Sequence, residues 1–203
     1  MHTQTVCVAG TNDWSDDDEV RWYCKGSPFI QLLERRGMCP FFTPDCGDPF
    51  IWSTDLGGIG FGNSDHKVWA AAGRSLKNFC VPPLAPHLRI PKDQLQIITH
   101  SHGVQVALYA AAAGLKIDRL ISVTGPVRRD MEPVIEKARP NIRYWRHVWT
   151  GGDWWQLMGG LFDRRLGVTR KFKQADNNVK IPGIGHSGLF RDPSFLAEWE
   201  WLI

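Results

Sequence analysis

A serine stands where the pattern of apolar residues changes from strand to helix. Residues 95–98 (LQII) form a short apolar run that favours a buried strand, whereas the alanine-rich segment 104–113 favours a closely packed helix. The sequence Thr-His-Ser-His-Gly joins them, with Ser101 at its centre. Because a strand that becomes a helix within so few residues makes a sharp turn, its central side chain stands above the edge of the sheet. Ser101 is therefore a candidate nucleophile.

The neighbours of Ser101 suit such a turn. Gly103 leaves room for close contact between strand and helix, and the backbone N–H of His102 falls at the helix N-terminus, where it can donate to an anion. These are parts of a nucleophile elbow, although Thr99 occupies the place of the first glycine in the G-x-S-x-G pattern. A small residue there is sterically feasible. Ser-x-Gly alone also fits a serine that only caps a helix.

A serine hydroxyl needs a general base, and His186 is the candidate. In sheets with a nucleophile elbow the chain order is Ser, then Asp or Glu, then His. The chain has seven histidines, at positions 2, 66, 87, 100, 102, 147 and 186. His100 and His102 flank Ser101 and are expected to point away from its side chain, and His147 lies within a predicted strand as a core histidine. His186 follows a later strand, between glycine-rich flanks.

Asp153 is the candidate for the acid that orients the histidine. It comes three residues after the predicted strand 142–150 and precedes His186, as the chain order requires. Asp163 and Asp176, which also precede His186, stay open as alternatives.

Strand-like and helix-like segments alternate along the chain. The apolar patterns predict strands at 6–9, around 39–43, and at 95–98, 120–124, 142–150 and 179–181. They predict helices at 29–36, 67–79, 104–113, 132–138 and 195–202. This alternation predicts an α/β fold with a mostly parallel sheet covered by helices on both faces. The length of 203 residues fits a single domain, 1–203.

Two glycine-containing segments are candidates for contact with a ligand. Gly10-Thr11-Asn12 follows the first strand, where Thr11 or Asn12 could supply a second backbone donor to an oxyanion. The segment 50–63 (FIWSTDLGGIGFGN) lacks the G-K-[ST] and G-x-G-x-x-G patterns of nucleotide sites, so we expect it to control substrate access.

Composition excludes several classes of function. The 24 Lys and Arg against 21 Asp and Glu give a net charge of +3, too weak to indicate a nucleic-acid partner. No apolar run reaches the roughly 20 residues of a membrane span, and the N-terminus lacks a signal-peptide pattern, so we expect a soluble, cytoplasmic protein. Five cysteines without C-x-x-C spacing predict buried free thiols rather than disulfides or a zinc site.

The chain resembles the α/β-hydrolase superfamily, in particular its small lipase- and esterase-like members, through residues 6–11, 99–103, 147–153 and 185–188. The resemblance implies hydrolysis of a small ester or acyl compound by Ser101, His186 and Asp153, without cofactor or metal. The N–H groups of His102 and Thr11 would form the oxyanion hole. The HGGG motif of many esterases is absent. The segment between Thr124 and the next strand is too short for a cap domain.

An open acyl pocket follows from this resemblance. The chain has ten tryptophans, and several lie near the predicted triad in sequence. The residues expected to line the pocket are Asn12, Trp14, Trp154, Trp155 and Leu189.

Other functions stay open. Thioesterase, peptidase or deacylase activity could use the same triad, because fold does not dictate substrate. Metal-assisted hydrolysis could use His100, His102 and a carboxylate, although a sharp turn would separate the two histidines. A catalytically idle scaffold that binds a partner through its tryptophans is the third alternative. The oligomeric state is not indicated.

Overall fold

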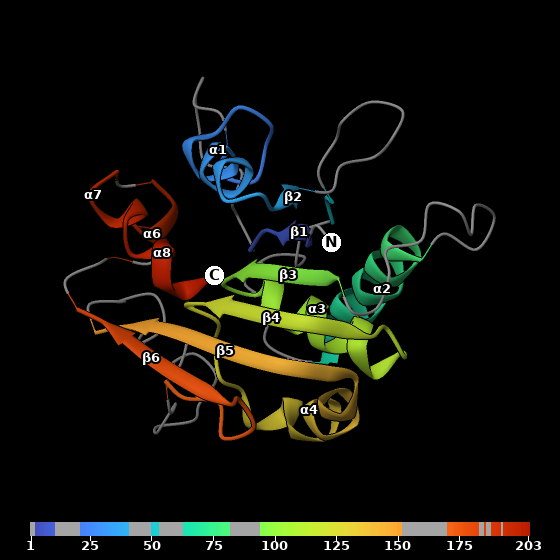
Figure 1. Cartoon of the computed structure of the whole chain (residues 1–203). Coiled ribbons are helices and arrows are strands. Elements are labelled where there is room, and N and C mark those ends of the chain that lie inside the picture. The colour runs from blue at the N-terminus through green and yellow to red at the C-terminus, as the bar shows by residue number, and fades with distance from the viewer. Residues whose placement is uncertain are drawn as a thin grey trace.

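In the part of the chain that the structure describes, six parallel strands form the sheet at the centre of the fold (Figure 1). In chain order they are β1 (Gln4–Val8), β2 (Cys39–Pro40), β3 (Leu95–His100), β4 (Ile117–Val123), β5 (Ile142–Thr150) and β6 (Asn177–Ile181). Their order across the sheet is β2-β1-β3-β4-β5-β6. The computed structural model describes residues 3–10, 21–40, 50–52, 63–81, 94–151, 170–182, 185, 188–191 and 193–203.

Helices cover both faces of this sheet (Figure 1). On one face lie α2 (Asn63–Cys80), α3 (Gly103–Ala112) and α4 (Glu132–Ala138), and on the other lie α1 (Pro28–Arg35), α6 (Gly188–Arg191), α7 (Pro193–Leu196) and α8 (Trp199–Leu202). Side chains alternate across a strand, so Ile97 belongs to the first apolar cluster and Ile98 to the second. The predicted α/β fold, with a parallel sheet between two helical layers, is confirmed.

Local signals explain why α1 forms where it does. The Ser27 hydroxyl accepts a hydrogen bond from the backbone N–H of Ile30 at 3.1 Å and donates to the Trp22 carbonyl at 2.6 Å. Gly37, with φ 70°, follows the helix in the left-handed conformation that glycine adopts most readily. The helix therefore begins and ends close to the predicted bounds, 29–36.

The helix predicted at 195–202 is wrong in one respect, because the chain divides there into α7 and α8. Trp199 is fully buried, and its indole N–H donates to the Leu189 carbonyl at 2.7 Å. The Arg146 guanidinium holds the carbonyls of Trp201 and Leu202 at 2.8 and 2.6 Å. These contacts fix the last turn of the chain, and they outweigh the local preference for one continuous helix.

The other predicted elements agree with the structure or lie partly outside it. Helix α4 and strand β5 have the predicted bounds, and α2 begins at Asn63, four residues before the predicted start. In the predicted strand around 39–43, β2 covers Cys39–Pro40 and residues 41–49 lie outside the described residues. The same holds for 53–62 of the glycine-containing segment.

Cys7 and Cys80 are buried free thiols, as predicted, whereas Cys24, which also forms no disulfide, is half-buried rather than buried. Burial raises the pKa of the Cys80 thiol to about 12 and also raises the pKa of Cys7, so both stay protonated at neutral pH. In the part of the chain that the structure describes, no helix has the length and apolar character needed to cross a bilayer.

Candidate active site

Ser101 lies at the apex of the turn between β3 and α3. Its φ of 49° is in the left-handed region, which costs a non-glycine residue about 1–2 kcal/mol. The Ser101 N–H donates to the Val123 carbonyl of β4 at 2.9 Å, and this bond holds the turn against the sheet. Ser101 is 7% exposed, and it follows the carboxyl end of a central strand. The predicted strand–serine–helix turn is therefore formed, with Thr99 inside the strand that precedes it.

Three glycines make space for this turn. A Cβ on Gly103 would lie 2.5 Å from the Val8 carbonyl oxygen, and one on Gly10 would lie 2.6 Å from Ser101 Cβ. A Cβ on Gly125 would lie 2.7 Å from Val104 Cγ1. Such distances are too short for real Cβ atoms, so β1 and the end of β4 approach the turn only because these positions are glycines. Sequence reasoning anticipated this role for Gly103 and missed it for Gly10 and Gly125, which follow strand ends.

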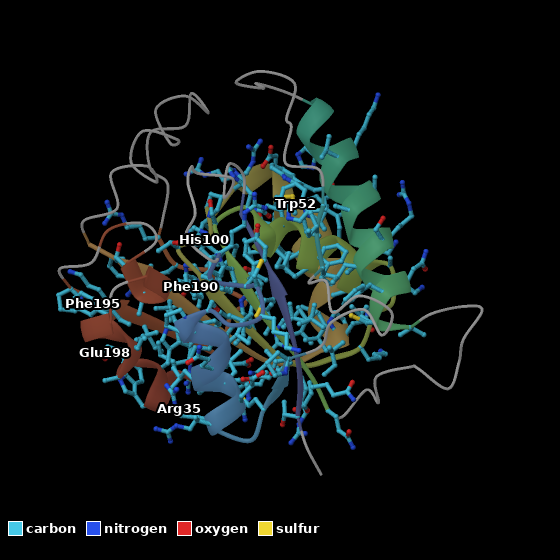
Figure 2. The ribbon with its side chains drawn as sticks, turned by 90° about the horizontal axis from the view of Figure 1, so that it is seen from above. Arg35, Trp52, His100, Phe190, Phe195 and Glu198 are labelled. Carbon is cyan, nitrogen blue, oxygen red and sulfur yellow. The ribbon has the colours of Figure 1, made fainter. Side chains whose placement is uncertain are left out.

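The two histidines beside Ser101 lie on opposite faces of the sheet. His100 is 2% exposed and packs edge-on against Phe190, with ring centroids 5.4 Å apart (Figure 2). It also packs edge-on against Trp22, at 6.3 Å. His102 stacks on Trp69 of α2, with ring centroids 5.5 Å apart and planes inclined by 18°. The two imidazoles therefore do not share a metal ion. No group of three or more His, Cys, Asp or Glu side chains in the described ranges is placed to hold a metal.

His147 is a core histidine, as predicted. It is fully buried on β5, where its Nδ1 lies 2.9 Å from the Ser122 hydroxyl, and its ring packs edge-on against Phe172 at 4.7 Å. Burial lowers the pKa of His147 to about 3, although contacts with the Arg170 backbone and Ser122 oppose the shift. This imidazole is neutral at pH 7 and has no access to solvent.

Asp176 lies at the edge of the sheet opposite Ser101. It precedes the first residue of β6, where its carboxylate accepts hydrogen bonds from Arg139 at 2.6 Å and from the backbone N–H of Trp145 at 2.7 Å. Ser101 follows the last residue of β3, and all the strands are parallel. Asp176 is therefore a structural residue at the amino edge, and this alternative for the acid is excluded.

The remaining predicted site residues lie mostly outside the described residues. These are Thr11, Asn12, Trp14, Asp153, Trp154, Trp155 and His186, together with the alternative acid Asp163. Leu189 is described: it is 1% exposed on α6, within the apolar cluster that includes Phe29 and Phe190. The strands that lead to the predicted donor, acid and base are β1, β5 and β6, and all three end at the edge of the sheet where Ser101 lies.

Solved structures with a similar fold are hydrolases and esterases. A protein from Thermoplasma acidophilum described as a predicted CIB-like hydrolase has a TM-score of 0.55 at 11% identity, with 98% of this chain and 84% of that chain covered. A carboxylesterase from the thaumarchaeon Nitrososphaera gargenis has a TM-score of 0.53 at 12% identity, with 98% and 88% covered. An esterase from Pyrococcus furiosus has a TM-score of 0.52 at 13% identity, with 98% and 77% covered. No protein-family model and no curated protein sequence matches the chain.

The chain has an α/β-hydrolase fold. The likeness spans nearly all of this chain, and at such low identity it establishes the fold alone. Within this α/β-hydrolase fold, Ser101 occupies the turn between a central strand and its following helix, with the N-terminus of α3 directly behind it. The described part of the site can therefore hold a hydroxyl close to backbone N–H donors.

Sequence reasoning missed a cluster of polar and aromatic side chains beside His102 in this α/β-hydrolase fold. Arg128 lies over the Trp69 ring at 5.0 Å and forms hydrogen bonds of 2.6 and 3.1 Å with the Asp130 carboxylate. Asp130 also contacts His66 Nε2 at 3.1 Å, and His66 Nδ1 lies 2.7 Å from the Tyr109 hydroxyl. The cluster joins α2, α3 and the segment after β4, which are distant in sequence, so no local pattern could have revealed it.

Arg128 and Asp130 form an ion pair within this cluster. Burial raises the pKa of Asp130, but hydrogen bonds from Arg128 and His66 outweigh that effect and hold the pKa well below its ordinary value. Asp130 is therefore ionised at neutral pH and neutralises the Arg128 guanidinium. The Arg128 guanidinium is therefore paired beside the turn and is not a free positive charge there.

Proposed function

We propose that this chain is a serine hydrolase that cleaves carboxylic esters of small molecules through an acyl-enzyme. The observation that carries the proposal is the conformation of Ser101: a non-glycine residue with positive φ, at a turn from a central strand into a helix. Backbone strain of this kind persists only where the surrounding structure imposes it, and it is concentrated at functional sites. Three glycines and a hydrogen bond to β4 impose it here.

The proposed chemistry assigns one role to each residue. His186 takes the proton of the Ser101 hydroxyl as the hydroxyl attacks the ester carbonyl, and later gives that proton to the leaving alcohol. Asp153 fixes the tautomer of His186 and stabilises its charged form. Water then cleaves the acyl-enzyme by the same steps in reverse.

Backbone donors complete the proposed site. The N–H groups of His102 and Thr11 bind the oxygen that becomes negative in the tetrahedral intermediate, and each contributes about 3 kcal/mol to the transition state. His102 is described at the N-terminus of α3, where helix N–H groups point outward, and this supports its part in the proposal.

The position of the strand ends supports Asp153 and His186 as partners of Ser101. Strand β5 ends at Thr150, three residues before Asp153, and β6 ends at Ile181, five residues before His186. Both ends lie at the carboxyl edge, whereas Asp176 and His147 are held in structural contacts elsewhere. Thioester, peptide or other acyl substrates would use the same groups, so a panel of substrates decides among them.

Replacing the serine tests the proposal. We expect Ser101→Ala to lower the kcat/KM for p-nitrophenyl esters of short acids by on the order of 10⁴-fold or more, because the nucleophile is removed. Wild-type protein should also react covalently with a fluorophosphonate at Ser101, and the variant should not. Undiminished turnover by Ser101→Ala would contradict the assignment, and a folded wild-type protein that neither turns over esters nor reacts would indicate an idle scaffold.

A matched pair of aspartate variants serves as control. Asp153→Asn should lower ester turnover strongly, while Asp176→Asn should leave turnover near the wild-type value because Asp176 lies at the opposite edge of the sheet. Equal losses in the two variants would contradict the proposed role of Asp153.

A further inference from the structure

The side chain of His102 is anchored by a ring of contacts that closes on its own helix. His102 stacks on Trp69, and Trp69 packs under the guanidinium of Arg128. Asp130 links Arg128 to His66, which reaches the hydroxyl of Tyr109. Tyr109 lies on α3 seven residues after His102, and His66 and Trp69 lie three residues apart on α2. At these spacings each pair shares one face of its helix, so the ring joins the first two turns of α3 to α2.

Close packing of α2 on α3 makes this ring possible. A Cβ on Gly73 of α2 would lie 2.6 Å from Tyr109 Cβ and 2.8 Å from the backbone N of Ala110. The absence of a side chain at Gly73 therefore sets the distance between the helices. The atoms in contact there are backbone atoms and a Cβ, and none is the end of a flexible side chain. The position of Trp69 relative to His102 is therefore fixed by the fold.

Ring contacts hold Trp69 in this position. The Trp69 side chain is fully buried, yet its indole N–H has no acceptor among the residues that the structure describes. The ring packs instead against the imidazoles of His66 and His102 and the guanidinium of Arg128. A buried donor without an acceptor is unfavourable, so the value of a tryptophan here lies in its broad aromatic face, which binds a guanidinium better than smaller rings do.

The strained turn explains what such an anchor does. Ser101 is in the left-handed conformation, and glycines fit around it at positions 10, 103 and 125. These glycines leave room for the turn, but they do not fix the side chain of His102, the residue that follows Ser101. The His102 side chain forms no capping hydrogen bond on α3, and its ring stacks on Trp69 instead.

We infer that Trp69, held by Arg128, is a positioning residue: through its stack on His102 it fixes the backbone N–H of His102 toward the oxygen that becomes negative during ester cleavage. This inference rests on the proposed function. It predicts that loss of the stack weakens stabilisation of the transition state and leaves binding of the neutral ester unchanged.

Two substitutions at Trp69 and one elsewhere test the inference. Trp69→Leu removes the ring, and Trp69→Phe retains an aromatic face for His102 while removing the buried N–H that has no acceptor. Trp145→Leu is the matched control, because Trp145 is also fully buried in the apolar cluster that contains Trp69 but contacts Phe172 and Ser122 instead of the turn. Melting temperature, kcat and KM for a p-nitrophenyl ester, and the rate of reaction with a fluorophosphonate are measured for each.

The expected result is a split between kcat and KM. Trp69→Leu should lower kcat and the fluorophosphonate rate about 10-fold or more, within the roughly 10²–10³-fold effect of losing an oxyanion donor, with KM unchanged. Trp69→Phe should recover most of that loss. Trp145→Leu should lower the melting temperature without lowering kcat.

Other outcomes overturn the inference. These are a wild-type kcat in Trp69→Leu, an equal loss of kcat in Trp145→Leu, or a failure of Trp69→Phe to recover kcat. If Trp69→Leu does not fold, Arg128→Met decides, because it removes the guanidinium above the ring: a kcat below the wild-type value at unchanged KM supports the inference, and a wild-type kcat overturns it. A wild-type protein that does not react with the fluorophosphonate overturns the proposed function itself.

Discussion

Two serines, Ser122 within β4 and Ser101 just after the end of the neighbouring strand β3, show how position decides chemistry. Ser122 in β4 has a histidine within hydrogen-bond distance, since His147 Nδ1 lies 2.9 Å from its hydroxyl, and Trp145 donates to the same oxygen at 2.9 Å. Ser101 instead follows the end of β3 in a strained turn. Ser122 and His147 are 0% exposed, whereas Ser101 is buried with 7% of its surface exposed, at the edge of the sheet.

A serine–histidine contact alone does not make a nucleophile. The buried imidazole has its pKa lowered to about 3, so at neutral pH it does not accept a proton readily, and no ester can reach it. The contact holds β4 to β5 instead. At Ser101 the strand end, the positive φ and the N-terminus of α3 are the features on which the proposed attack on a carbonyl rests.

The largest effect on stability should follow from a substitution that disrupts the turn at Ser101. A Cβ at Gly103 would lie 2.5 and 2.7 Å from the carbonyl oxygens of Val8 and Ala9, and both are backbone atoms. We expect Gly103→Ala to lower the free energy of unfolding by about 3 kcal/mol, because β1 or α3 must shift. Urea denaturation measures this change.

Gly185→Ala is the control for that measurement, since a Cβ at Gly185 would meet no atom of the described residues within 4 Å. Its free energy of unfolding should stay within about 0.5 kcal/mol of the wild-type value. If Gly103→Ala were as stable as Gly185→Ala, the close approach of β1 to the turn would be refuted.

A smaller effect on stability should follow from removing the Ser122 hydroxyl. Ser122→Ala deprives the Trp145 indole N–H of its acceptor and His147 Nδ1 of its partner, both inside the core. We expect the free energy of unfolding to fall by about 2 kcal/mol, with kcat/KM for esters unchanged. Ser101→Ala should do the reverse: little change in stability and loss of turnover. Loss of turnover in a folded Ser122→Ala protein would contradict the separation of roles.

Much of the Ser101 region could be predicted because its signals are local. An apolar run, a serine, a glycine and an alanine-rich segment follow one another within 20 residues, and each favours one conformation. Strand β5 and helix α4 were predictable for the same reason. The chain order favours Asp153 as the acid, which stays a prediction, and leaves Asp176 open as an alternative; Asp176 directly precedes β6, at the amino edge of the sheet.

The rest depends on contacts between segments that are distant in sequence. No local pattern brings Trp69 onto His102, or places Gly10 and Gly125 against the turn. Thr124 has φ 48° although it is neither glycine nor asparagine, so its sequence gave no sign of a left-handed conformation. The break between α7 and α8 likewise follows from tertiary contacts of Trp199, which override helix propensity.

The smallest expected effect is the contribution of the buried His147, the partner of Ser122, to the pH dependence of stability. The pKa of His147 is about 3 in the folded protein and 6.5 when unfolded, so between these values the unfolded chain binds one proton more. Stability is therefore complete above pH 6.5 and falls as the pH decreases. From pH 7.5 to 5.5 this histidine should remove about 1.4 kcal/mol, the equivalent of one pKa unit. His147→Gln, which cannot titrate, should lack this part of the decrease when the two proteins are compared by urea denaturation at both pH values. An identical decrease in both proteins would mean that the folded protein also protonates His147 over this pH range. The buried Ser122–His147 pair would then be able to accept a proton, as a reactive serine–histidine pair does.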